Sequence, residues 1–453
     1  MQSTESAATP AGPRKVVAAS MAGTVAEWYE FLLYSASSAL VFGDVFFPNS
    51  GDPLDGVINA LLVYAVGFVA RPLGGIVFGH FGDRVGRKKL LQLSLLMVGA
   101  ATFLIGCVPA YSSIGFWAPT ILVLLRFVQG FAVGGEWGGA VLLVGEHSPD
   151  ARRAYWSSWP QAGLPLGNLL ATIVLLSLSF SLSDTAFAAW GWRTAFWASA
   201  IIVLVGYYIR TQVEESPIFL DSLERAKERE TARSSVIEVL KHYPRGVLIS
   251  MGARVAENIL YQVVVTFSIT YLALRVGSST TDILLLLAVA HVVHLAIVPW
   301  FGHLADRFGR RPVYLTGSVL MIGWGFAGFP LMDTGNPGLV VLALVLGVLV
   351  HALMYAPQPA MMAELFPTRM RYAGVSLAYQ TTSIFAGSLA PFITASLLKT
   401  YGSPVPIAVY LAGAAVISTV AVLAAKETRG MSLTALDTPD QTRQVDRHPP
   451  LDV

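Results

Sequence analysis

The sequence is short of cysteine and of charged residues, and both shortages limit what the protein can be. Its single cysteine, Cys107, has no second cysteine with which to form an intramolecular disulfide or a thiolate metal site. Only 13% of the 453 residues are charged, against about 25% in an average soluble domain, while 54% are hydrophobic. This imbalance is typical of a polytopic membrane protein whose outer surface contacts lipid.

Three further shortages exclude other classes of function. The net charge is only +2, so nothing indicates a nucleic-acid partner. No group of His, Asp and Glu has the spacing of a metal site, and no catalytic motif is present. We therefore expect no metal, no cofactor and no enzymatic activity. Residues 1–13 lack the apolar core of a signal peptide and predict a disordered tail.

Long apolar runs dominate what is present. Each is long enough to cross the roughly 30 Å of a bilayer core, and they lie at about 16–42, 56–80, 89–110, 117–144, 153–181, 191–212, 245–275, 281–304, 313–333, 338–365, 371–398 and 403–425. The sequence therefore predicts an all-α polytopic membrane protein with twelve transmembrane helices in two six-helix bundles. The predicted parts are a disordered tail, a first bundle, a charged linker, a second bundle and a disordered tail, at 1–15, 16–213, 214–244, 245–425 and 426–453.

A charged signature of ten residues occurs twice, each time between two apolar runs. It reads GHFGDRVGRK at 79–88 and GHLADRFGRR at 302–311, which is 223 residues later. A repeat separated by about half a chain indicates two related halves.

The basic residues fall mostly on one side of the predicted membrane. Of the 30 Lys and Arg, 24 lie in the tails, the central linker or the loops on the side of the two signatures. Three lie in the opposite loops (Arg193, Arg275 and Lys399) and three within apolar runs. Because cytoplasmic loops carry the excess of Lys and Arg, both termini and both signatures are predicted to be cytoplasmic.

Seven charged residues lie deep inside predicted spans, well away from the ends of the runs. A charge at this depth costs roughly 2.5–3.5 kcal/mol on insertion scales, so such residues face a polar cavity or a partner. They are Glu27 and Glu30 in the first run, Arg71 in the second, Arg126 and Glu136 in the fourth, and Arg254 and Glu257 in the seventh.

The acids of the first and fourth runs are candidates for carrying a proton. Glu27 and Glu30 are three residues apart and share a helical face that Tyr34 extends by one turn. Burial favours the protonated form of a carboxylate unless a cation holds it ionised, so the alternative is a structural ion pair between helices. Glu136, within GGEWGG, is a candidate for a proton pathway or an intracellular gate.

The arginines are candidates for binding an anion. Arg126, with Gln129 one turn away, presents a fork that suits a carboxylate, either of a substrate or of an acid in the first run. Arg254 and Glu257 repeat the three-residue spacing and either neutralise each other or line a cavity. Arg71 is expected to pair with an acid or to extend toward the membrane surface.

Polar residues near these charges complete the predicted site. His351 has Tyr355 and Gln358 at helical spacing, whereas His291 and His294 are expected to pack. The predicted substrate contacts are Tyr34, Arg126, Gln129, Arg254, Asn258, Gln262, His351 and Tyr355, and the predicted proton-coupling acids are Glu27, Glu30, Glu136 and Glu257.

Longer phrases point to a family. The two signatures look like those of loops 2–3 and 8–9 in the major facilitator superfamily. The other phrases are AEWYEFLLY, LRFVQGFAVGGEWGGA, EESPIF and AELFPTRMRYAG, at 26–34, 125–140, 214–219 and 363–374. Together they resemble the metabolite:proton symporter family, which includes transporters for shikimate, 2-oxoglutarate, citrate and proline/betaine. The pattern is nearest the shikimate-type branch.

The resemblance implies a mechanism and residues for it. It places a functional arginine at Arg126 and gives the two signatures the role of locking the cytoplasmic side, through Asp83, Arg84, Arg87, Asp306, Arg307 and Arg310. It also implies alternating access, proton coupling and a location in the bacterial inner membrane, and we expect a monomer. The buried arginines favour an anionic substrate.

The leading prediction is import of a small carboxylated metabolite, shikimate-like or a dicarboxylate, by proton symport. A zwitterionic osmolyte such as proline or betaine is an alternative substrate. A drug:proton antiporter is a weaker one, because GLPLG at 163–167 matches the exporter signature only in part. Neither a catalytic motif nor an appended soluble domain supports a membrane enzyme or a sensor.

Overall fold

The computed structural model describes residues 13–48, 52–85, 87–134, 142, 144–145, 148–211 and 236–433. All regular structure in these residues is helical, with no strand among them. Nine of the described helices are long and apolar enough to cross a membrane, and two shorter apolar helices lie at Gln92–Cys107 and Trp117–Val133. The predicted all-α membrane fold is confirmed. Residues 1–12 and 434–453 of the predicted tails and most of the predicted linker lie outside the described residues. Helix α1 (Pro13–Ser37) begins inside the predicted first tail, and the described part of the second tail ends at residue 433.

The first half is built around six long helices. They are α1 (Pro13–Ser37), α3 (Pro53–Val85), α4 (Arg87–Cys107), α6 (Trp117–Val133), α8 (Arg153–Ser181) and α10 (Trp192–Thr211). Short helices connect or extend them: α2 (Gly43–Phe46), α5 (Tyr111–Ile114) and α9 (Asp184–Ala186).

The second half begins with α12 (Val236–His242) and contains the remaining helices. They are α13 (Pro244–Tyr261), α14 (Ser268–Tyr271), α15 (Thr280–Phe308), α16 (Arg310–Asp333), α17 (Pro337–Tyr355), α18 (Gln358–Ala363), α19 (Thr368–Thr382), α20 (Leu389–Tyr401) and α21 (Val405–Ala424). The predicted run at 371–398 is thus divided between α19 and α20 by a π-helical turn, Ser383–Ser388, and α13 continues into another, Gln262–Phe267.

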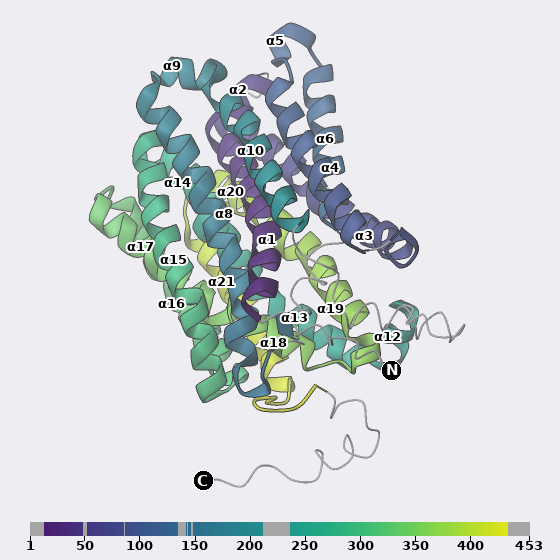
Figure 1. Ribbon diagram of the computed structural model, residues 1–453. Helices are drawn as coiled ribbons and strands as arrows, with labels where there is room; N and C mark the ends of the chain where they lie inside the picture. The colour runs from purple at the N-terminus through teal and green to yellow at the C-terminus, as the bar shows by residue number, and fades with distance from the viewer. Residues whose placement is uncertain are drawn as a thin grey trace.

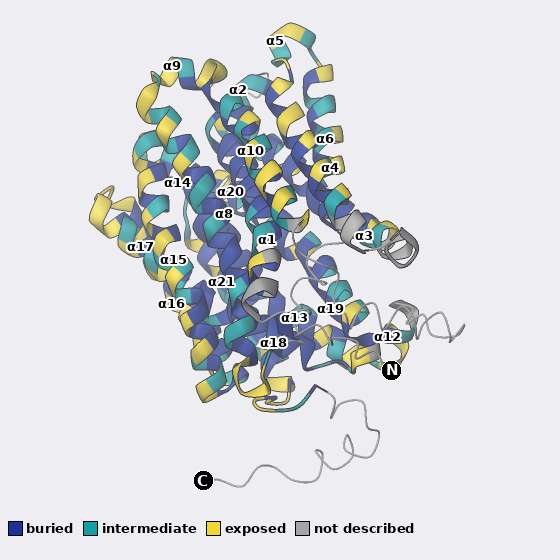
Figure 2. Cartoon of the chain, viewed as in Figure 1, coloured by how far each residue is buried: buried dark blue, intermediate teal, exposed yellow. Residues whose placement is uncertain are grey.

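The two halves meet along long helix pairs. α8 of the first half packs along α15 of the second, and α3 packs against α20 (Figure 1). Buried residues gather on the central helices, whereas the outer helices present exposed side chains (Figure 2). Many of these exposed side chains are apolar, among them Leu124, Ile201, Val319 and Val420. Their exposure is what contact with lipid requires.

Glycines allow α3 and α6 to approach backbone to backbone. A methyl group at Gly130 would overlap the carbonyl oxygen of Gly67, and one at Gly134 would overlap that of Arg71. In the other direction, a methyl group at Gly74 would overlap the carbonyl oxygen of Phe131. Small residues at such crossings drive helix association in membranes, and this one fixes Arg71 against the helix that carries Arg126.

Gly130→Ala should therefore destabilise the protein. The added methyl group forces α3 and α6 apart, and overpacking of this kind costs about 1–3 kcal/mol. Gly323→Ala is the matched control, since nothing lies within 4 Å of the position of its added methyl group. Thermal unfolding of the purified proteins in detergent measures both. Equal unfolding temperatures for the two variants would contradict this account of the crossing.

Candidate functional site

Glu27 of α1 and Arg71 of α3 form a buried ion pair. Nη2 of Arg71 lies 2.9 Å from Oε1 of Glu27, and neither side chain is more than 5% exposed. The Arg71 guanidinium also lies 4.5 Å from the ring centroids of Phe31 and Phe68, which adds cation–π attraction. Arg71 thus has an acid as its partner. For Glu27 the sequence left two alternatives, a structural ion pair and a proton-coupling role, and the structure shows it in an ion pair.

Arg126 of α6 is fully buried among aromatic rings and amide groups. Its guanidinium carbon is 4.4 Å from the ring centroids of Phe31 and Tyr34 and 4.7 Å from that of Tyr64. Nη1 donates to Oε1 of Gln129 over 3.0 Å, and Nε donates to the carbonyl oxygen of Tyr64 over 3.4 Å. Within the described residues, Nη2 has no hydrogen-bond partner, and no carboxylate lies within 4.0 Å of the group.

Glu30 lies in the same buried region. Neither of its carboxylate oxygens has a hydrogen-bond partner within the described part of the chain. Its electrostatic neighbours are Arg126, Glu27 and Thr102. The Thr102 hydroxyl accepts a hydrogen bond from Nε2 of Gln129 over 2.6 Å, so Gln129 connects the surroundings of the acid to Arg126. The first half therefore buries an acid, Glu30, and a guanidinium group, that of Arg126, neither of which forms an ion pair with a described residue.

Arg254 of α13 lies in a polar cluster of the second half. Nη1 is 3.4 Å from Oε2 of Glu257 and 3.1 Å from Oε1 of Gln358, and Nη2 is 3.3 Å from Oγ of Ser383. The guanidinium carbon lies 3.3 Å from the ring centroid of Tyr379. The structure thus places Arg254 and Glu257 close enough to neutralise each other, while neutral partners surround the cation.

Glu257 also contacts a histidine chain. Its Oε1 lies 3.3 Å from Nε2 of His351, and Nδ1 of His351 lies 3.0 Å from Nε2 of His294 on α15. The rings of Tyr355 and Tyr261 pack on His351 with centroid separations of 4.7 and 5.1 Å. His351 and Tyr355 are brought into the cluster together, and so is His294, which the sequence assigned to packing.

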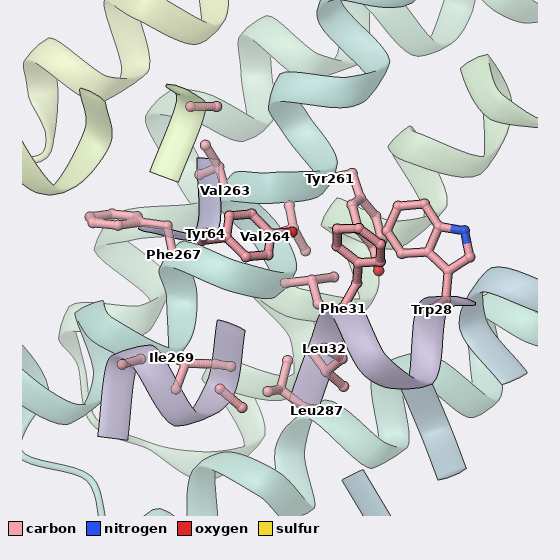
Figure 3. Close-up of a cluster of buried hydrophobic side chains, with 14 of the residues drawn as sticks. Trp28, Phe31, Leu32, Tyr64, Tyr261, Val263, Val264, Phe267, Ile269 and Leu287 are labelled. Atoms are coloured by element: carbon pink, nitrogen blue, oxygen red, sulfur yellow. The ribbon is translucent and has the colours of Figure 1, made fainter. Parts of the chain in front are cut away.

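Aromatic and amide side chains join the halves at the level of these clusters. Nε2 of Gln262 donates to the Tyr64 hydroxyl over 3.3 Å, and Nδ2 of Asn168 donates to the Tyr261 hydroxyl. The Trp28 ring meets Tyr261 edge-on with a centroid separation of 5.3 Å. Figure 3 shows Trp28 on α1 and Tyr261 on α13 facing each other across the boundary between the halves.

Two of the three described π-helical turns of the second half lie beside this region. Gln262 begins one turn and Ser383 begins the other. Asn258 lies against Gly387 of the second turn, where an added methyl group would come within 3.0 Å of the Asn258 amide oxygen. Because π turns recur at functional sites, they support the placement of Asn258 and Gln262 in the site.

Some residues of the site had no signal in the sequence. Tyr64 and Thr102 lie within apolar runs, with no charged or polar residue three or four positions away on the same helix face to mark them. They enter the site only because α3 and α4 pack beside α6. Uncharged polar residues of this kind are identified from the packing of the helices in the structure and not from a pattern in the sequence.

The second charged signature lies at one end of the interface between the halves. The Asp306 carboxylate accepts the backbone N–H groups of Ala154 and Tyr155 over 3.0 and 2.8 Å, at the first turn of α8. An anion is favourable at a helix N-terminus, and here the anion and the helix belong to different halves. Nη1 of Arg310 lies 3.2 Å from Asp306.

Glu364 extends this cross-link. Its Oε1 lies 2.7 Å from Nη1 of Arg153 in the first half and 3.2 Å from Nη2 of Arg310 in the second. Its Oε2 accepts a hydrogen bond from Thr428, which follows α21. Arg307 is exposed and takes no part in these ion pairs. The predicted gate residues Asp306 and Arg310 are therefore together, with Glu364 and Arg153 as unforeseen partners.

Four predicted residues lie outside the described part of the structure. They are Glu136 and the side chains of Asp83, Arg84 and Arg87. At the end of the interface opposite Glu364, Lys399 of α20 pairs with Asp55 of α3. The hydroxyls of Ser179 and Thr281 lie 2.5 Å apart between α8 and α15. Contacts thus join the halves at both ends.

Comparison with known proteins gives relatives over nearly the whole chain. A family model described as sugar (and other) transporter matches residues 15–238 and 220–438. The inner membrane metabolite transport protein YhjE of Escherichia coli (strain K12) is 39% identical over 431 residues, which cover 94% of this chain and 97% of the relative. The shikimate transporter of the same organism is 38% identical over 418 residues, which cover 92% of this chain and 95% of the relative.

A solved structure shares the fold. It is that of the major facilitator superfamily proton:xylose symporter XylE bound to 6-bromo-6-deoxy-D-glucose. The TM-score is 0.74 at 17% sequence identity, and the match covers 94% of this chain and 98% of the solved one. At this identity the likeness shows the fold alone.

Removing Arg71 should destabilise the protein strongly, because Glu27 would stay buried without its cation. Breaking a buried pair in this way costs about 3–5 kcal/mol, so Arg71→Met should lower the unfolding temperature. Glu27→Gln combined with Arg71→Met should recover most of the loss. Asp333→Asn breaks the exposed pair with Arg275 and should change stability by no more than about 1 kcal/mol. A double variant no more stable than Arg71→Met would show that the charge pair is not the cause.

Proposed function

This chain belongs to the sugar and other transporter family of the major facilitator superfamily, and on that premise we propose that it imports a small carboxylated metabolite by proton symport. It is a multi-pass membrane transporter and not an enzyme. The proposal adds the anionic substrate, the proton coupling and the direction of transport. It also adds that the protein is a monomer and that both termini are cytoplasmic. The distribution of Lys and Arg supports the cytoplasmic termini.

The state of Arg126 carries the proposal. A buried guanidinium is costly unless an anion compensates it, and Arg126 has an open Nη2 and no described carboxylate partner. A substrate carboxylate supplies the missing charge and accepts two parallel hydrogen bonds from the fork. The rings of Phe31, Tyr34 and Tyr64 limit the directions from which such a carboxylate approaches.

Proton coupling is assigned to Glu30 in the first half. Glu27 already has Arg71 as a partner, whereas neither oxygen of Glu30 has one. An isolated acid inside a membrane protein takes up a proton more readily than an ion-paired one. When one proton moves inward with one monocarboxylate anion, no net charge crosses the membrane, so the pH difference drives the uptake, with about 1.4 kcal/mol or tenfold accumulation for each pH unit.

The contacts at the two ends support alternating access. The halves rock about the central site in this fold class, so the Asp306–α8 and Arg153–Glu364 contacts must break when the cytoplasmic side opens. The Lys399–Asp55 pair must break when the outer side opens. It is exposed, and exposed pairs are individually weak, which suits a contact broken once per cycle.

A zwitterionic osmolyte is the second candidate. Glu30 and the rings of Phe31 and Tyr34 lie near Arg126, so an ammonium group of the substrate would find both an anion and aromatic faces. In that case Glu30 would bind the substrate and not the proton. A substrate without an ammonium group separates the two candidates.

Uptake in cells tests the symport. Cells expressing the protein should take up shikimate or a dicarboxylate faster at acidic external pH, and a protonophore should abolish the accumulation. Arg126→Gln should reduce uptake at least about tenfold, as expected for loss of an interaction worth 1.4 kcal/mol or more. Arg275→Gln is the control, because that arginine is exposed. Uptake indifferent to pH and protonophore would reject proton symport, and normal uptake by Arg126→Gln would reject the role of this arginine.

Opening of the cytoplasmic side tests the gate. Ser158 is buried on α8 beside Gly302 of α15, so a cysteine there should react with a maleimide only when this end opens. In a Cys107→Ser/Ser158→Cys background, Glu364→Gln should raise the alkylation rate of the purified protein several-fold. Asp55→Asn, which loosens the opposite end, should not raise it. An unchanged rate in the Glu364 variant would show that this cross-link does not hold the end closed.

A further inference from the structure

An apolar groove runs between the two halves, near the end of the interface that holds the second charged signature. It has a volume of about 560 Å³ and is lined by residues of α8 in the first half, of α15 in the second half and by Met21 of α1. On α8 the lining residues are Tyr155, Trp159 and Leu166. α8 packs along both α1 and α15 (Figure 1). No residue of the central site lines the groove, so the two are separate.

On α15 the groove follows one face of the helix. Leu295, Pro299 and His303 line it, and their four-residue spacing places them on one face. The His303 ring meets the Tyr155 ring of α8 edge-on, with a centroid separation of 6.5 Å. One further turn along the same face lies Arg307, which is exposed. The apolar face of α15 therefore ends in a cation.

Each half contributes one exposed arginine at this end of the groove. Arg152 belongs to a short turn that precedes α8 and contacts α15, and neither it nor Arg307 has an ion-pair partner within the described residues. The described acids beside them are already engaged. Asp150 pairs with Arg153, and Asp306 accepts backbone N–H groups of α8. The end of the groove therefore suits an anion, because no described acid is free to receive an ammonium group.

The groove has the depth and length of one leaflet of the membrane. Tyr155, Trp159 and Trp300 line it near the arginines, and Trp and Tyr are enriched at the level of the lipid headgroups. Trp300 is 53% exposed, so the groove faces the lipid. From Tyr155 to Leu166 α8 rises about 16 Å at 1.5 Å per residue, and one leaflet of the hydrocarbon core is about 15 Å thick. The groove thus matches one acyl chain, with the arginines at the headgroup.

We propose that this groove binds one anionic phospholipid, with an acyl chain along α8 and α15 and the phosphate between Arg152 and Arg307. Arginine donates paired hydrogen bonds to a phosphate, and basic pockets between transmembrane helices bind anionic headgroups. Because the two arginines belong to different halves, the bound lipid connects the halves where Asp306 contacts α8. The lipid binds when this end is closed and is released when the halves separate here. The proposal requires neither the substrate nor the proton coupling proposed above.

Native mass spectrometry of the purified full-length protein tests the site. Given equal amounts of phosphatidylglycerol and phosphatidylcholine with the same acyl chains, the protein should retain phosphatidylglycerol preferentially. Arg152→Gln and Arg307→Gln should each weaken this retention about fivefold, which is the contribution of roughly one basic residue near an anionic surface. Lys241→Gln on α12 is the matched control, because this exposed cation lies at the same end of the molecule and lines no part of the groove. Equal retention of the two lipids, or an equal loss in the control, would overturn the proposal.

A second pair of variants tests the acyl chain. Ala296 lines the groove, so Ala296→Trp should fill it and reduce the retention of phosphatidylglycerol several-fold. Val319→Trp on the exposed face of α16 should leave retention unchanged. Glycerol phosphate, which carries the charge of the headgroup without the chains, should not displace the lipid. Displacement by glycerol phosphate, or full retention in Ala296→Trp, would show that the arginines bind an anion without the groove and would overturn the lipid site.

A third comparison tests the connection between the halves. Glu364→Gln removes the cross-link to Arg153 and changes no residue of the groove, so it should lower retention of the lipid by loosening this end. Asp55→Asn at the opposite end should not lower it. Unchanged retention in Glu364→Gln would overturn the connection of the halves by the lipid. None of these measurements uses a transport substrate, so their failure is distinct from failure of uptake, which bears on the proposed function.

Discussion

Arg126 holds its charge in the interior of the first half with aromatic rings and amides around it, and that constraint shapes the neighbouring structure. A buried cation without an anion is costly, so the site must hold it in place by other means. The rings of Phe31, Tyr34 and Tyr64 attract its faces, and Gln129 takes one of its donors. The close crossing of α3 and α6 brings Tyr64 to it. What remains open is one nitrogen, and the proposed substrate carboxylate fits there.

The two halves arrange their buried acids and arginines differently. In the first half the acid that pairs with a cation, Glu27, and the acid without a partner, Glu30, are separate residues of one helix face. In the second half one acid, Glu257, meets both Arg254 and a histidine chain. Among the described residues, Glu30 and Arg126 of the first half form no ion pair, whereas Glu257 of the second half contacts both a cation and a histidine chain.

The sequence predicted the fold well, because membrane spans and a repeated signature are local patterns. It also predicted the burial of the charged residues deep inside the spans that the structure describes, because a charge at that depth needs a partner or a cavity. It did not predict the burial of Arg153 and Glu364, which lie near the ends of predicted runs. Which acid pairs with which arginine was harder to predict from the sequence. Arg71 and Glu27 are 44 positions apart, and the sequence offered Glu27, Glu30 and substrate as competing partners of the arginines. The choice depends on which helix faces meet, and single side chains such as Thr102 and Tyr64 carry no pattern that reports it. His294 was assigned to packing for the same reason, because its contact with His351 joins two helices.

The central claim is that a buried guanidinium binds the carboxylate of the substrate. The most direct measurement is thermal stabilisation of the purified protein by matched pairs of ligands, each a carboxylate and its primary amide, with shikimate and its amide as the first pair. The wild type should be stabilised by the carboxylate and not by the amide, and Arg126→Gln should lose this discrimination. Equal stabilisation of the wild type by both members of a pair would contradict it.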